Sequence, residues 1–174
     1  MLSKNLNYPR TGSHGDLKKG YHAPLHCWDI LSMHLGELAR EGKRQVEYTI
    51  LSHYKQQYRW VFDLEHALKT SYDALVLTDA DVAIQWVNTG FTQMTGYGKQ
   101  EVVGRSPKML QGPNTKEDAR RRVRQKLYDQ ESFTEDLVNY RKTGEEYLCR
   151  VEIHPIFDES NRLSHYLALE QELK

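Results

Sequence analysis

The chain has no long hydrophobic run, few cysteines and no excess of charge, and each absence excludes a class of protein. No apolar stretch approaches the about 20 residues that span a membrane, and the N-terminus has no hydrophobic signal region. The two cysteines, Cys27 and Cys149, lie far apart and do not indicate a secreted disulfide framework. A formal net charge of zero argues against nucleic acid or an anionic membrane as a partner. We therefore expect a soluble, cytoplasmic protein.

Catalytic motifs are missing as well. The sequence has no nucleophile elbow, no phosphate-cradling glycine loop and no metal-ligand pair on a helix. His22, His26, Cys27 and His34 lie near one another in the sequence, but they lack the spacing of a structural zinc site. We therefore predict that the chain is not an enzyme and holds no metal.

We predict one domain that is preceded by an N-terminal extension of 71 residues. Glycines without apolar periodicity predict a flexible arm over residues 1–26. Residues 27–71 have helical spacing, and we expect a cap or dimerisation element there: a helical hairpin or a dimerising helix, weakened around Gly42. Its second half carries an apolar stripe that fits either core packing or an interface: Leu51, Tyr54, Tyr58, Val61 and Leu68.

Residues 72–174 have the pattern of an α+β domain. Strands are expected at 74–78, 83–88, 133–141, 146–157 and 163–171, with short helices and a basic helix at 115–128 between the second and third strands. Asn88 is expected to cap a helix that stops at Gly96. This order predicts a five-stranded antiparallel sheet with helices on one face, preceded by N-terminal amphipathic helices. A cavity between sheet and helices would suit a planar ligand.

Three motifs in this region resemble those of a known sensor family. The stretch Gly104-Arg-Ser-Pro-Lys-Met-Leu-Gln-Gly-Pro113 is similar to the signature of LOV domains, the flavin-binding, blue-light branch of the PAS family. Residues 87–97, which end in threonine-glycine-tyrosine, and residues 139–144 are similar to two further PAS motifs. The resemblance covers residues 72–171 and implies the PAS fold.

The resemblance also implies a set of flavin contacts, with FMN as the possible cofactor. Asn139 matches an asparagine at the pyrimidine edge of the flavin, and Gln171 matches the last-strand glutamine that reads flavin N5 and O4. Gln111 matches a contact to the ribityl chain. Arg124 matches the arginine that pairs with the flavin phosphate, and Lys108 replaces a second such arginine with loss of the bidentate geometry.

Three positions depart from the family pattern. Pro107 replaces the cysteine that attacks flavin C4a, so the cysteinyl photoadduct is excluded. Ser106 and Cys149 replace two asparagines that contact the flavin, which weakens flavin binding without excluding it. Cys149 is either a small strand residue that fills space or a substitute thiol next to the flavin.

Each site residue also has a structural interpretation. Asn139 and Gln171 could be ordinary polar strand residues, and Gln111 could be a loop residue. Most arginines of the basic helix would form a solvated face, with one facing a phosphate. That helix contains no histidine, which disfavours a haem with an axial histidine ligand.

We therefore expect a stand-alone sensory signalling protein of the PAS family, LOV-like but unable to form the photoadduct. No effector segment is recognisable in the 174 residues, so the output is expected to pass through a homodimer or an unknown downstream partner protein. A cofactor-free PAS scaffold for protein–protein interaction is the alternative, and a flavin-dependent redox enzyme is a third possibility.

Overall fold

The computed structural model describes the chain from residue 26 to residue 174, with side chains from Ser32 onward. The predicted flexible arm over residues 1–26 therefore lies outside the described residues apart from its last backbone position. Contacts divide the chain after Arg40, and the part from Glu41 to Lys174 contains the sheet.

The N-terminal helical region is one long helix followed by a single helical turn. Helix α1 covers His26–Tyr58 without interruption, so the predicted weakening at Gly42 is wrong. A glycine inside a helix costs only about 1 kcal/mol relative to alanine, and good helix formers flank Gly42 on both sides. The four-residue α2 (Leu64–Ala67) follows, and the Asp63 side chain caps it by accepting from the His66 amide at 2.9 Å.

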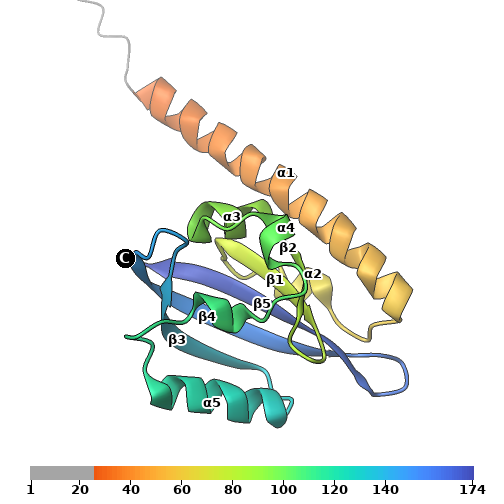
Figure 1. The fold of residues 1–174 in the computed structure, drawn as a ribbon. Helices are drawn as coiled ribbons and strands as arrows, with labels where there is room; N and C mark the ends of the chain where they lie inside the picture. Colours follow the sequence, from red (N-terminus) through yellow and green to blue (C-terminus); the bar gives the residue numbers. More distant parts are fainter. Residues whose placement is uncertain (1–25) are drawn as a thin grey trace, which may run out of the picture. The chain divides into compact units, whose positions relative to one another are not determined.

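Five antiparallel strands form one sheet, as the sequence predicts (Figure 1). In spatial order the sheet runs β2-β1-β5-β4-β3, so the first and last strands in the sequence lie side by side at its centre. The strands are β1 (Ala74–Asp79), β2 (Ile84–Val87), β3 (Phe133–Tyr140), β4 (Glu146–Phe157) and β5 (Leu163–Leu173). All four neighbouring pairs are antiparallel.

The helices between β2 and β3 cover one face of this sheet. They are α3 (Thr89–Thr95), α4 (Lys99–Val102), the 3₁₀ helix η1 (Pro107–Leu110) and α5 (Glu117–Tyr128). The predicted cap is confirmed, because the Asn88 side chain accepts from the Phe91 amide at 2.9 Å. Helix α3 ends at Gly96, whose φ of 77° is a left-handed conformation that glycine adopts without strain.

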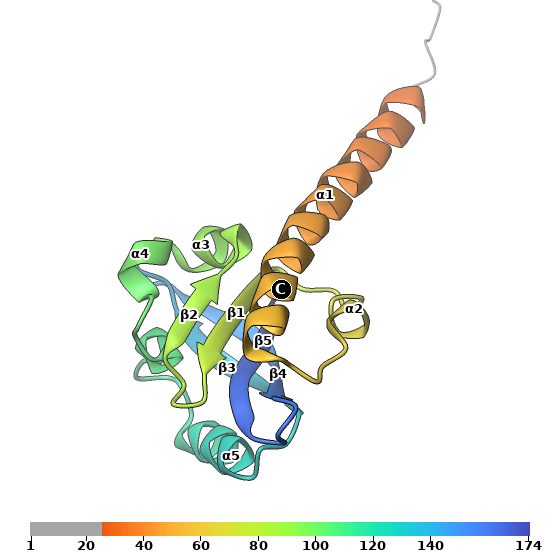
Figure 2. The same ribbon diagram turned by 90° about the vertical axis from the view of Figure 1, so that its right-hand side faces the viewer.

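The other face of the sheet packs against α2 and the α1 residues from Glu41 onward (Figure 2). Leucines of the central strands alternate toward this side, and they contact Leu51 of α1 and Trp60 in one buried cluster. The strand leucines in this cluster are Leu75, Leu77, Leu167 and Leu169. Residues of opposite parity on the same strands, such as Val76 and Ala168, face α3 to α5 instead. This alternation decides which side chains reach the cavity.

Candidate functional site: a cavity between the sheet and α5

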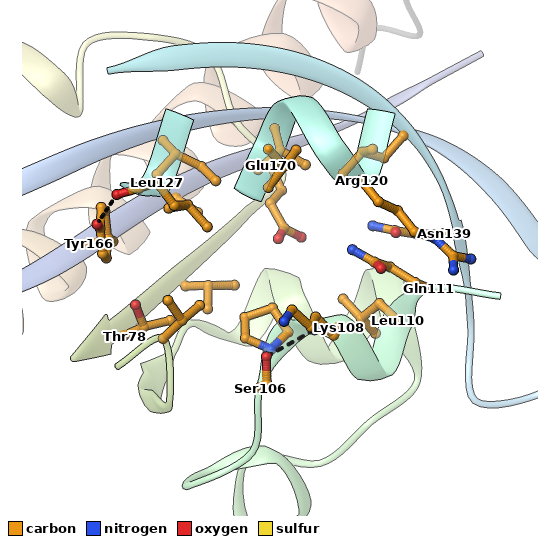
Figure 3. A pocket seen from close by; sticks show the side chains of 18 of the residues that line it. Thr78, Ser106, Lys108, Leu110, Gln111, Arg120, Leu127, Asn139, Tyr166 and Glu170 are labelled. Atoms are coloured by element: carbon orange, nitrogen blue, oxygen red, sulfur yellow. Dashed lines mark hydrogen bonds between the residues drawn. The ribbon is translucent and has the colours of Figure 1, made fainter. Parts of the chain in front are cut away.

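A cavity of about 280 Å³ lies between the sheet, η1 and α5 (Figure 3). This volume is close to the lower end of the roughly 300–1,000 Å³ of small-molecule sites. Branched apolar side chains from the sheet, η1 and α5 form much of its wall. They include Val76, Leu110, Val123, Leu137, Val151 and Ile153. Such walls suit the faces of a flat, largely apolar ring.

Four of the six predicted cofactor-binding residues line this cavity: Lys108, Gln111, Arg124 and Asn139. Asn139 is only 4% exposed, and its backbone forms an isolated antiparallel bridge with Gln111. Figure 3 shows the two amide side chains pointing into the cavity from the same side. The structure therefore brings together donors and acceptors that the sequence separates by 28 positions, 111 to 139.

The two predicted cations contribute to the same wall from different elements. The Arg124 side chain is about half exposed and pairs with Glu117 of the same helix at 2.7 Å. Lys108 is exposed on η1, where Ser106 accepts from its backbone amide at 3.4 Å. A ligand with an anionic tail could exchange the Glu117 carboxylate for its own charge at Arg124.

Gln171 does not line the cavity, which corrects the prediction for this position. Along β5, Leu167 and Leu169 face the α1 side of the sheet, and Gln171 has the same parity. Its neighbour Glu170 points into the cavity instead. The alternation of the two leucines was the signal that could have identified Glu170 from the sequence.

Glu170 is a buried carboxyl group, and no described residue supplies a counter-charge at hydrogen-bond distance from it. The residue is 3% exposed, and its Oε2 has no hydrogen-bond partner among the residues that the structure describes. Burial raises the pKa of Glu170 to about 7, since the low-polarity surroundings disfavour the carboxylate. Below neutral pH the cavity therefore contains a mostly neutral carboxyl group that can donate a hydrogen bond.

Arg120 is a second cavity residue that the sequence interpretation left out. Its guanidinium donates to the carbonyl of Gly112, while its buried Nε finds no partner within the described part of the chain. The spacing of Arg120, Val123, Arg124 and Leu127 is that of one helix face, and all four line the cavity. Helical periodicity within the arginine run was the available signal.

Cys149 is fully buried but does not line the cavity. It packs in the core cluster on the same face of the sheet, and its thiol donates to the carbonyl of Arg150 at 3.7 Å. Burial raises the pKa of this thiol well above its usual range. Both the predicted cofactor contact and the substitute-thiol hypothesis therefore lack support from the geometry. Pro107 and Ser106, in contrast, do line the cavity.

The described residues contain neither a metal-ligand cluster nor a membrane-spanning helix. Within them, no group of three or more histidines, cysteines or carboxylates could hold a metal ion. His34 is exposed, whereas the side chains of His22, His26 and Cys27 fall outside the described part of the chain. No helix from residue 26 onward combines the length and the apolar character that crossing a membrane requires.

Comparison with known proteins identifies the fold family. The PAS domain family matches residues 73–173, which span all five strands from β1 to β5. The chain belongs to the PAS domain family. Within the solved structures, the PAS fold of this chain is similar to one described as "Flavin Analogue Sheds Light on Light-Oxygen-Voltage Domain Mechanism". The TM-score is 0.60 at 32% identity, over 66% of this chain and 87% of that one.

Curated relatives of this PAS chain are longer proteins with different names. The bacterioopsin transcriptional activator of Halobacterium salinarum is 34% identical over 96 residues, which are 55% of this chain and 14% of that protein. The blue-light photoreceptor of Listeria innocua is 33% identical over 100 residues, which are 56% of this chain and 40% of that protein. The chain thus spans well under half the length of either relative.

Proposed function

We propose that this PAS domain is a sensory module of the LOV-like type that binds a flavin, FMN in the first instance, without forming a cysteinyl adduct. The cavity supports this proposal because it combines three features. Branched apolar side chains form much of its wall, two amides and a carboxyl group whose Oε2 has no partner among the described residues line it, and Lys108 and Arg124 supply positive charge. The similarity to a Light-Oxygen-Voltage structure and to a blue-light photoreceptor points to the same ligand class.

Named residues of the cavity fit the parts of a flavin. Asn139, Gln111 and Glu170 would meet the polar edge of the ring, while Val123 and Leu137 would contact its faces. Arg124 and Lys108 would hold the phosphate. A bound flavin would supply absorption of blue light and reversible redox chemistry. Pro107 has no nucleophile, so the signal would arise from a change in hydrogen bonding at the ring edge and not from a covalent bond.

The phosphate role of Arg124 can be tested with two flavins that differ only by that phosphate. We expect Arg124→Ala to weaken FMN binding roughly tenfold, since a charge-assisted hydrogen bond contributes about 1.5–3 kcal/mol. Riboflavin binding should change less than about twofold, because riboflavin has no phosphate. Quenching of flavin fluorescence measures both affinities.

Arg121→Ala is the matched control. Arg121 lies on the same helix, is exposed, pairs with Asp118 at 2.7 Å and does not line the cavity. Its loss should leave both affinities unchanged. Equal loss of FMN and riboflavin in Arg124→Ala would contradict the phosphate role.

The position of Arg120 favours a second candidate function, a cofactor-free PAS scaffold. Its guanidinium reaches back to the carbonyl of Gly112, on the side of the cavity where Gln111 and Asn139 lie (Figure 3). A side chain that occupies this space supplies polar contacts without any ligand. Failure of the purified protein to take up riboflavin or FMN would favour the scaffold.

A further inference from the structure

Glu170 has an unusual position for a carboxyl group. It lies on the central strand β5, between Ala74 of β1 and Val151 of β4 in the register of the sheet. Neither neighbour has a polar side chain. Figure 3 shows the carboxyl group pointing away from the sheet toward the segment from Ser106 to Leu110, with the amides of Gln111 and Asn139 to one side. The group is thus presented to whatever occupies the cavity.

The ionisable groups around the cavity do not neutralise Glu170. On α5, Arg120 donates to the carbonyl of Gly112, and Arg124 pairs with Glu117. Lys108 of η1 lines the cavity as well and forms no hydrogen bond with Glu170. From β4, the pKa values of Tyr147 and Cys149 are raised first by burial and then by the nearby Glu170 carboxylate. None of these five groups forms a hydrogen bond with Oε2 among the described residues.

We propose that Glu170, in its protonated form, donates a hydrogen bond to an acceptor on the inner edge of the flavin ring, so that ligand binding requires a proton on Glu170. This inference rests on the proposed function for the identity of the ligand. The resemblance implies an amide from the last strand at this edge of the ring, whereas the residue of that strand that lines the cavity is Glu170, a carboxyl group. Binding thereby becomes coupled to pH.

The chemistry of the two partners explains the requirement. An oxidised flavin ring presents N5 and the O4 carbonyl as acceptors at one edge. A carboxylate has only acceptor atoms, so ionised Glu170 would face the ring edge with repulsion and without a hydrogen bond. A protonated carboxyl group has one donor, which satisfies both Oε2 and the ring acceptor. The flavin should consequently bind the protein when Glu170 is protonated and should not bind it when Glu170 is ionised.

Titration of the 174-residue apoprotein with riboflavin tests this claim, because riboflavin lacks the phosphate that titrates near neutrality. Fluorescence quenching would give the Kd at intervals from about pH 5.5 to about pH 8.5. We expect the Kd of the wild type to be constant at low pH and to rise toward tenfold per pH unit once Glu170 ionises. An affinity that stays flat across this range would overturn the proposal.

Three variants separate the donor from the charge. Glu170→Gln keeps a donor that does not titrate, so its Kd should match the low-pH value of the wild type at every pH. Glu170→Leu keeps the approximate size without a donor and should bind roughly tenfold more weakly at every pH. Gln171→Leu changes the adjacent residue on the opposite face of the sheet and should retain the wild-type pH profile. A pH slope that persists in Glu170→Gln would assign the titration to another group.

The riboflavin titration distinguishes a failure of the flavin proposal from a failure of the proton requirement. If riboflavin does not bind the wild type or any variant at any pH, both the flavin proposal and the Glu170 contact to it are wrong. If riboflavin binds with a flat pH profile, the proposed function stands and the proton requirement alone fails. Infrared difference spectra between wild type and Glu170→Gln supply a second readout. They should show a protonated carboxyl band that persists when riboflavin binds, and its absence from the complex would contradict the hydrogen bond.

Discussion

At the scale of single residues, the chemistry of the cavity depends on two buried polar atoms without partners in the described chain, Oε2 of Glu170 and Nε of Arg120. A buried polar atom without a hydrogen-bond partner lowers the free energy of unfolding by about 1–3 kcal/mol. A domain selected for stability alone would have apolar side chains at these positions. Their presence in the same cavity supports a site that a polar ligand completes.

The raised pKa of Glu170 makes a prediction about stability. Because folding raises the pKa from 4.5 to about 7, the folded state holds this proton more tightly than the unfolded state. The stability from the protonated carboxyl is fully present below pH 4.5 and is lost as pH rises through about 7. Glu170→Gln should therefore be more stable than the wild type at alkaline pH, by up to about 3 kcal/mol.

Urea denaturation at about pH 5 and about pH 8.5 measures this difference. At the lower pH the two proteins should have closer midpoints, since Glu170 is then mostly protonated and resembles glutamine. Glu159→Gln, which removes an exposed carboxylate in the turn between β4 and β5, is the control. Equal free energies of unfolding for wild type and Glu170→Gln at both pH values would contradict the burial of an ionisable carboxyl.

The same residues show how far the sequence predicts the site. The three motif-matched residues Lys108, Gln111 and Asn139 all line the cavity, and each lies beside a recognisable turn or hairpin. It selects Gln171 over Glu170 because an amide is expected, although the strand alternation favours the even-numbered residue. The unpaired Nε of Arg120 could not be predicted from the sequence. It results from the orientation that the guanidinium takes when it donates to the carbonyl of Gly112.

At the scale of elements, a buried polar network joins α1 to the sheet and to α3. Glu47 of α1 is 8% exposed and accepts from the Asn88 side-chain amide and from the Tyr72 hydroxyl, each at 2.7 Å. The side-chain oxygen of Asn88, Oδ1, in turn accepts from the backbone amides of Leu75 and Phe91. One carboxylate therefore connects the helical extension with the start of α3 and with β1, and β1 supplies Val76 and Thr78 to the wall of the cavity.

Removal of this carboxylate should destabilise the domain. Glu47→Ala would leave the Asn88 amide and the Tyr72 hydroxyl buried without their acceptor, and we expect a loss of about 2–3 kcal/mol in the free energy of unfolding. Hydrogen exchange should also accelerate in α1 beyond Glu41. Glu41→Ala, at an exposed position of the same helix, should change stability by less than about 0.5 kcal/mol. A similarly small effect of Glu47→Ala would refute the connection.

Most elements could be predicted from the sequence, while the role of α1 could not. The strands and their turns have local signals, including the Asn88 cap, Gly96 and Gly144, and the structure has each of them. Glu47 looks like one of many charged residues on a polar helix, because its partners lie 25 and 41 positions away. A contact at that separation has no local signature.

At the scale of the whole molecule, α1 carries exposed leucines that fit the homodimer expected from the sequence. Leu35 and Leu38 are 57% and 50% exposed on this helix, and their spacing places both on one face. We propose that a second copy of the chain covers them. Light scattering after size exclusion should give twice the chain mass for the wild type and the single chain mass for the double variant Leu35→Glu/Leu38→Glu. A monomeric wild type would contradict the dimer, and riboflavin binding should be unaffected in either protein.

The absorption spectrum of the purified protein after reconstitution with FMN tests the central claim most directly. A flavin held in the cavity predicts a retained yellow protein whose blue absorption band shows resolved vibrational structure, as a rigid and partly apolar site would give. Illumination with blue light should not convert this band to that of a cysteinyl adduct, because Pro107 stands at the cavity wall. A protein that remains colourless after reconstitution would contradict the account, and so would reversible formation of an adduct spectrum under blue light.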